Sequence, residues 1–134
     1  MSHFAKLFIT AALAFLVFDF TWLLLIARQM YQEHLGSLLG TTKIIPAVLF
    51  YIVYLVGLLF FVVYPALEKD SMMYALLAGA FLGFLCYATY DLTNSATIKD
   101  WPILVTIIDL IWGTAVTAVT SGITFYVAQY FNWR

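Results

Sequence analysis

The chain has 134 residues, of which 65% are hydrophobic and only 10% are charged, and its formal net charge is -1. Soluble globular domains carry about 25% charged residues, so this composition excludes a globule solvated by water and requires lipid around the protein. The small net charge and the lack of a Lys/Arg run in the sequence argue against a nucleic-acid partner and against a polybasic lipid anchor.

The N-terminal segment begins like a secretory signal peptide, because Lys6 precedes an apolar run that ends in small residues. The apolar sequence nevertheless continues through Ile26. The apolar region of a signal peptide spans only about 7–15 residues. We therefore expect an uncleaved transmembrane helix at this position.

A hydrocarbon core about 30 Å thick is crossed by about 20 apolar helical residues. The sequence predicts four such spans, at residues 4–27, 44–67, 72–98 and 102–131, in an all-α membrane bundle that forms a single domain, 1–134. Ser71 and Asp100 stand where they could cap the third and fourth spans. The connection after the first span has apolar residues at helical spacing, which predicts a short interfacial helix: Tyr31, Leu35, Leu38 and Leu39.

The basic residues do not fix the orientation in the membrane, because an excess of Lys and Arg normally marks the cytoplasmic side. Three lie on the side of the termini and three on the side of the first and third connections: Lys6, Lys69 and Arg134 against Arg28, Lys43 and Lys99. Either orientation is compatible with this tie, and dual topology, as in small multidrug transporters, stays open.

Three aspartates, Asp19, Asp91 and Asp109, lie inside the apolar spans. A charge at such a depth costs about 2.5–3.5 kcal/mol on insertion scales, so these residues rarely persist without a partner, a cavity or a function. Antiparallel spans place all three in the same half of the membrane, with no Lys or Arg at that depth in the sequence. We expect at least one of them to be protonated, or a cation to lie among them.

Small and hydrogen-bonding residues recur at steps of three or four along the third and fourth spans, which is typical of helix–helix interfaces in membranes. Gly79, Gly83 and Gly113 are the predicted helix-packing residues. On the second span, one face carries Tyr54, Gly57, Phe61 and Tyr64. Two stripes are predicted to face inward, one with Gly79, Gly83, Tyr87, Asp91, Asn94 and Ser95 and one with Thr106, Asp109, Trp112, Gly113, Thr117, Thr120 and Thr124.

The candidate binding site combines the acidic residues with polar and aromatic neighbours on these stripes. Its predicted members are Asp19, Asp91, Asp109, Trp22, Tyr87, Tyr90, Asn94 and Trp112. The alternative is purely structural, with each carboxylate accepting hydrogen bonds that tie helices together. We expect no metal site and no cofactor, because His3 and His34 lie outside the spans and Cys86 is the single cysteine.

Residues 90–94 have the sequence Tyr-Asp-Leu-Thr-Asn, and Lys99, Trp101-Pro102, Asp109-Leu110 and Trp112-Gly113 follow. On these residues the chain resembles, over nearly its full length, a family of small bacterial four-helix membrane proteins described as a domain of unknown function. The resemblance implies a multi-pass protein of a bacterial inner membrane and supplies no activity. Its signature residues include Asp91 and Asp109, which the burial argument selects independently.

Three classes of function agree with these features. The first is a proton- or cation-linked carrier or binding protein for a small hydrophobic or cationic molecule. The second is a membrane-embedded enzyme that acts on a lipid or isoprenoid through aspartate acid/base chemistry. The third is a non-catalytic subunit or assembly factor that docks through its glycine and threonine faces. Because four helices enclose little volume, we expect a homodimer or higher oligomer.

Overall fold

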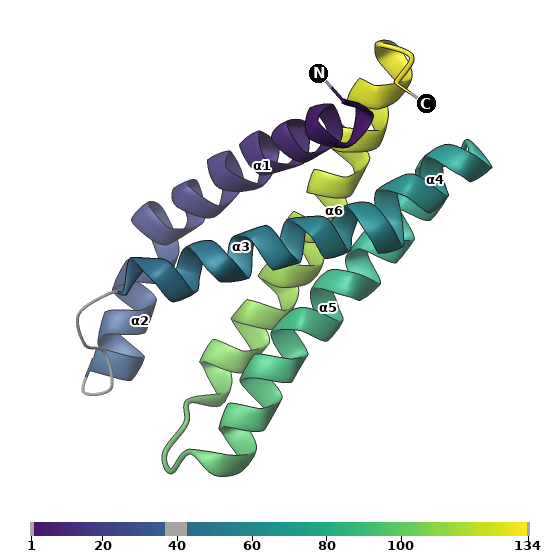
Figure 1. Cartoon of the computed structure of the whole chain (residues 1–134). Coiled ribbons are helices and arrows are strands. Elements are labelled where there is room, and N and C mark those ends of the chain that lie inside the picture. Colours follow the sequence, from purple (N-terminus) through teal and green to yellow (C-terminus); the bar gives the residue numbers. More distant parts are fainter. Residues whose placement is uncertain (1, 37–42, 134) are drawn as a thin grey trace.

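The computed structural model describes residues 2–36 and 43–133, and helices account for most of them (Figure 1). In chain order the elements are α1 (His3–Trp22), η1 (Leu23–Ala27), α2 (Arg28–Leu35), α3 (Ile44–Leu58), η3 (Leu59–Val63), α4 (Tyr64–Lys69), α5 (Met72–Thr97) and α6 (Ile103–Tyr130). The elements η1 and η3 are single π-helical turns inside longer helices.

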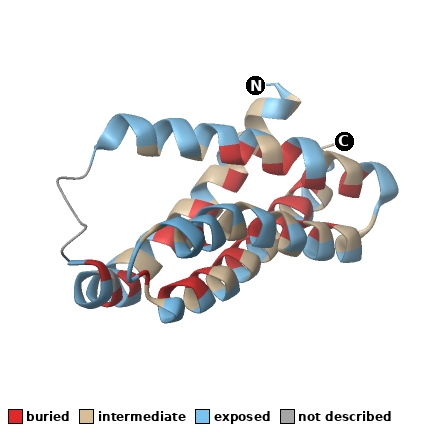
Figure 2. Ribbon diagram, turned by 90° about the horizontal axis from the view of Figure 1, so that it is seen from below, coloured by how far each residue is buried: buried red, intermediate tan, exposed pale blue. Residues whose placement is uncertain are grey.

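Four helical stretches in the described part of the chain are long and apolar enough to cross a membrane: His3–Met30, Ile44–Lys69, Met72–Thr97 and Ile103–Tyr130. This confirms the predicted all-α membrane bundle. The two termini lie at the same end of the bundle, as an even number of spans requires (Figure 1). Large apolar side chains such as Leu25 and Ile45 are exposed on the outer faces, whereas buried residues gather on the faces turned toward other helices (Figure 2). Lipid is the solvent that suits such a surface.

Of the two N-cap residues predicted from the sequence, one is confirmed and the other is not. Ser71 caps α5, because its hydroxyl accepts a hydrogen bond from the Tyr74 amide. The prediction that Asp100 caps the last helix is wrong. The N-cap residue of α6 is Pro102, which has an extended backbone and makes no side-chain cap. The helix therefore begins at Ile103, three residues after Asp100. Asp100 instead takes a left-handed turn position with φ 61°.

The segment after the first span continues the helix without a break. After the π-turn η1, α2 runs to Leu35, which packs with Trp101 and Val105 beside the α5–α6 turn. Leu38 and Leu39, the other apolar residues of the predicted interfacial helix, lie outside the described residues.

The helix α3–η3–α4 contains Pro65 in its interior, and this explains the π-turn before it. Proline has no N–H and its ring clashes with the carbonyl four residues earlier, that of Phe61. That carbonyl accepts a hydrogen bond from the Tyr74 hydroxyl of α5 at 3.5 Å. Because the π-turn shifts the register, the buried face continues through Leu58, Leu59, Val62 and Val63. The predicted inward position of Phe61 is wrong, since this side chain is 60% exposed.

The helices α5 and α6 form the closest contact of the bundle and run side by side along most of their length (Figure 1). The layers of their interface follow one another four residues apart: Gly79 against Ser121, Gly83 against Gly113 and Thr117, and Tyr87 against Gly113. A methyl group added at Gly83 would lie 2.5 Å from Thr117 Oγ1 and closer still to the Gly113 carbonyl oxygen. The two backbones therefore approach as closely as glycine allows.

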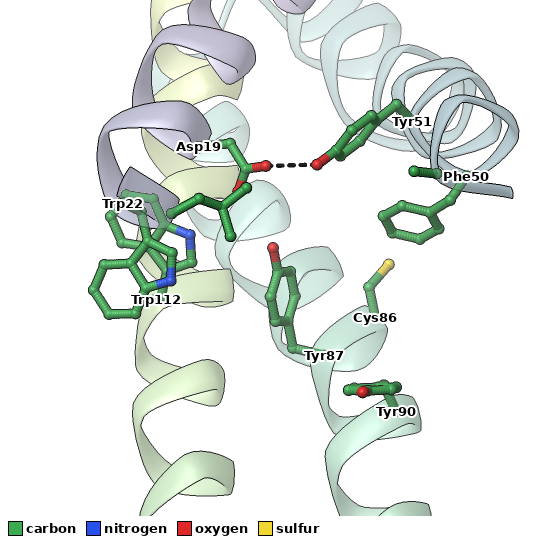
Figure 3. Close-up of a pocket in the computed structure, with 10 residues that line it drawn as sticks. Asp19, Trp22, Phe50, Tyr51, Cys86, Tyr87, Tyr90 and Trp112 are labelled. Carbon is green, nitrogen blue, oxygen red and sulfur yellow. Dashed lines mark hydrogen bonds between the residues drawn. The ribbon is translucent and has the colours of Figure 1, made fainter. Parts of the chain in front are cut away.

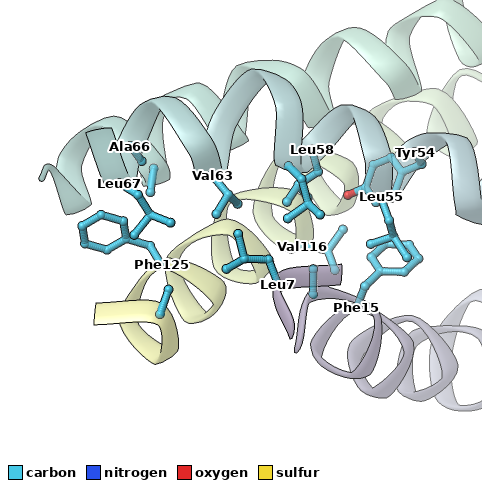
Figure 4. Close-up of a cluster of buried hydrophobic side chains, with 14 residues drawn as sticks. Leu7, Phe15, Tyr54, Leu55, Leu58, Val63, Ala66, Leu67, Val116 and Phe125 are labelled. Atoms are coloured by element: carbon cyan, nitrogen blue, oxygen red, sulfur yellow. The ribbon is translucent and has the colours of Figure 1, made fainter. Parts of the chain in front are cut away.

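The remaining helices pack on this pair through a cluster of buried apolar side chains from α1, α3–η3–α4 and α6 (Figure 4). Leu7 and Phe15 of α1, Leu58 of α3, Val63 of η3 and Val116 of α6 belong to it. From η3 onward the helix packs against α5, whereas the first half of α3 lies beside α1 (Figure 1). As a result, α3 and α5 diverge toward the end at which α3 begins.

We expect Gly83→Ala to lower the free energy of unfolding by about 1–3 kcal/mol, the usual cost of overpacking. The added methyl group meets the α6 backbone, which cannot move without separating the helices. Denaturation in mixed detergent micelles measures this effect. The matched control is Gly57→Ala on α3, where the methyl group meets nothing within 4 Å. Equal stability of the two variants would contradict the described α5–α6 contact.

Candidate functional site: an aromatic pocket and a buried pair of aspartates

A cavity of about 340 Å³ lies where α3 and α5 diverge, between the first half of α3 and the facing sides of α1, η1, α5 and α6. Six aromatic residues form most of its wall: Trp22, Phe50, Tyr51, Tyr87, Tyr90 and Trp112. Asp19, Leu23, Ala47 and Cys86 complete it (Figure 3). The cavity therefore combines an aromatic lining with a single carboxyl group.

Asp19 is buried on α1 and held by a residue of α3. The Tyr51 hydroxyl donates a hydrogen bond to Asp19 Oδ2 at 2.7 Å (Figure 3). The Tyr51 ring is itself supported by an edge contact with Phe15, with ring centroids 5.5 Å apart. This arrangement fixes the position of the carboxyl group in the cavity wall and joins the two helices that form one side of the pocket.

Two tryptophans close the end of the pocket beside Asp19. Trp22, the last residue of α1, stacks on Trp112 of α6, with ring centroids 4.5 Å apart and an interplanar angle of 8°. The Trp112 Nε1 atom is buried and lies near Asp19, but no described group meets hydrogen-bond geometry with it. The pocket thus contains a buried N–H donor next to the carboxyl group.

Tyr87 connects the pocket to the α5–α6 interface. Its ring lies against Gly113, so closely that a methyl group at Gly113 would overlap it. Its hydroxyl points toward the part of the pocket that contains Asp19 (Figure 3). Tyr87 therefore belongs both to the pocket wall and to the α5–α6 interface.

Asp91 and Asp109 lie one helical turn from the Tyr87–Gly113 layer, inside the α5–α6 interface, and they do not line the pocket. Their exposed fractions are 0% and 2%. The two carboxyl groups are neighbours. Asn94 lies near Tyr90 on the following turn of α5 and is also outside the pocket lining. The acidic residues therefore divide into Asp19 in the pocket and a separate pair beside it.

Five of the predicted site residues line the cavity: Asp19, Trp22, Tyr87, Tyr90 and Trp112. Sequence reasoning did not select the contributions of η1, α3 and the α5 cysteine, namely Leu23, Ala47, Phe50, Tyr51 and Cys86. A signal for part of this set was present, because Ala47, Tyr51 and Tyr54 share one helical face with Leu58. This face of α3 carries no charged residue, so the argument from buried charge did not select it.

The comparisons with known proteins bear on the whole chain. Residues 4–126 match the sequence model of a family described as Predicted membrane protein (DUF2177). The chain belongs to this family. Comparison with curated proteins and with solved structures gave no match. Membership establishes a multi-pass membrane protein, but the family description names no activity. The chemistry of the site therefore has to be derived from its own geometry.

For this DUF2177 member, the pocket presents the faces of aromatic rings and one carboxyl group. Aromatic faces attract cations, and quaternary ammonium groups are commonly bound by aromatic cages. Among the described residues, no group of three or more His, Cys, Asp and Glu side chains is placed to hold a metal ion.

We expect Tyr51→Phe to lower the free energy of unfolding by about 0.6 kcal/mol and by no more than about 1.7 kcal/mol, the average and the maximum measured for hydrogen bonds between membrane helices. The substitution keeps the ring against Phe15 and removes only the hydroxyl that binds Asp19. The same denaturation assay measures it, with Tyr126→Phe at an exposed position of α6 as control. If both variants unfold alike, the Asp19–Tyr51 bond contributes nothing to holding α1 against α3.

Proposed function

We propose that this chain is a proton- or cation-linked carrier or binding protein whose ligand is a small hydrophobic molecule with one positive charge. The observation that carries the proposal is the pocket itself. It places one buried carboxyl group, Asp19, among six aromatic side chains inside the membrane-spanning part of the bundle.

The charge of the ligand follows from the surroundings of Asp19. In the described sequence the Lys and Arg residues lie in the connections or near helix ends, away from the pocket lining. A cation in the pocket would supply the missing counter-charge and would also face the rings of residues such as Trp22 and Tyr87. Both interactions strengthen where water is excluded.

The size and position of the pocket favour a small ligand that reaches it through the hydrocarbon. Ligand pockets usually measure about 300–1,000 Å³, so a cavity of about 340 Å³ is at the small end of the range. Phe50 of α3 and Tyr90 of α5 line it and are each about half exposed. Both lie well inside their spans, which directs the mouth of the pocket toward lipid between α3 and α5.

Equilibrium binding to the chain in lipid nanodiscs tests the proposal, with benzyltrimethylammonium as the probe and neopentylbenzene as its uncharged isostere. We expect the cation to bind more tightly than the isostere. We expect Asp19→Asn to weaken cation binding by about tenfold or more, a loss of about 1.4 kcal/mol or more. A close charge pair at an effective dielectric constant of about 20 is worth up to about 4 kcal/mol.

The matched control for charge removal is Asp100→Asn. Asp100 lies exposed in the α5–α6 turn with φ 61°, a conformation that Asn also adopts readily. Its substitution should leave the affinity for benzyltrimethylammonium unchanged. Equal affinity of the wild type for the cation and the isostere, or wild-type cation affinity in Asp19→Asn, would refute the proposed function.

A further inference from the structure

Asp91 and Asp109 form a second acidic feature that the pocket does not use. Asp91 is fully buried, and neither of its carboxyl oxygens has a hydrogen-bond partner among the described residues. Its neighbour across the α5–α6 interface is the carboxyl group of Asp109. Buried polar atoms in native proteins are nearly always hydrogen-bonded. Asp91 therefore requires a hydrogen-bond donor beyond those that the described residues supply.

Among the described residues, no Lys or Arg side chain lies beside Asp91. The polar groups near it on α5 are Tyr87, Tyr90 and Asn94, and α1 contributes a further acid, Asp19. The ionisable residues Arg28, Glu33 and His34 of α2, which packs on α6, are exposed. Lys99 and Asp100 in the α5–α6 turn are exposed as well. Two ionised carboxylates side by side would repel each other.

A proton on one of the two carboxyl groups relieves the repulsion and supplies one of the missing hydrogen bonds. If one carboxyl group is protonated, its O–H donates to the other carboxylate, which satisfies an oxygen of Asp91 and removes the repulsion. We propose that Asp91 and Asp109 form a proton-binding site that holds at least one proton between them at neutral pH. Two side chains supply too few oxygen ligands for a divalent cation, which needs about six or more.

This inference deepens the proposed function. The proton site itself does not depend on that function, and only the coupling between the proton and the bound ligand rests on it. Tyr87 lines the pocket and its ring packs against Gly113, one helical turn from Asp91 and Asp109, so a single side chain separates the pocket from the pair. A cation bound in the pocket therefore disfavours the proton on the pair, and by thermodynamic linkage the proton disfavours the cation to the same degree. The proton is thus the coupling ion that a proton-linked carrier requires.

Infrared spectroscopy of the chain in lipid tests the site without any ligand. At neutral pH we expect the carbonyl-stretch band of a protonated carboxylic acid, shifted on deuteration and on isotopic labelling of aspartate. The band should disappear in Asp91→Asn/Asp109→Asn and persist in Asp19→Asn and in the control Asp100→Asn. If the double variant fails to insert, the single variants Asp91→Asn and Asp109→Asn, each predicted to diminish the band, take its place.

The absence of this band from the wild type would overturn the inference, and so would a band that is lost only in Asp19→Asn. A band that requires removal of Na⁺ would show that a monovalent cation, rather than a proton, occupies the pair. Saturating benzyltrimethylammonium should reduce the wild-type band, and an unchanged band would refute the coupling. Because the band needs no ligand, failure of cation binding with the band intact would overturn the proposed function alone.

Discussion

The close contact of α5 and α6 determines the arrangement of the other elements. Gly83 and Gly113 allow the two backbones to approach within a distance that no larger residue permits. In a bilayer this is a main source of helix association, because apolar side chains gain little by leaving lipid for protein. The same contact buries Asp91 and Asp109 in the interface and leaves a notch at Gly113 that receives the Tyr87 ring. Packing and polarity are therefore inseparable in this half of the bundle.

The pocket is a consequence of how the other two spans meet this pair. Pro65 introduces the π-turn η3, after which the second span packs closely on α5. Before the turn, α3 lies beside α1, and the Tyr51–Asp19 hydrogen bond secures it there. The space between α3 and α5 is filled incompletely by aromatic side chains. A cavity with one fixed carboxyl group results, beside an acid pair that belongs to the rigid α5–α6 contact.

Much of this structure could be predicted from the sequence. The parts that could not be predicted share one cause. Hydropathy located the four spans, and the spacing of Gly79 and Gly83 indicated the interface at which they are found. The depth argument placed all three aspartates in the same half of the membrane. Depth says nothing about which way a side chain faces, so it could not separate Asp19 from the α5–α6 pair. The Asp19–Tyr51 contact depends on the tertiary packing of α1 and α3, which no local pattern encodes.

The proposed function depends on the binding of a hydrophobic cation beside Asp19. The most direct test is a solid-state NMR measurement of the distance between the ¹⁵N nucleus of labelled benzyltrimethylammonium and the ¹³Cγ nuclei of labelled aspartates in the lipid-embedded chain. We expect a dipolar contact at about 4–6 Å, the range of a close ion pair, and we expect this contact to disappear in Asp19→Asn. Binding beside Asp19 would be contradicted if the nitrogen of the bound ligand showed no dipolar contact with any aspartate. It would also be contradicted if the contact persisted in Asp19→Asn.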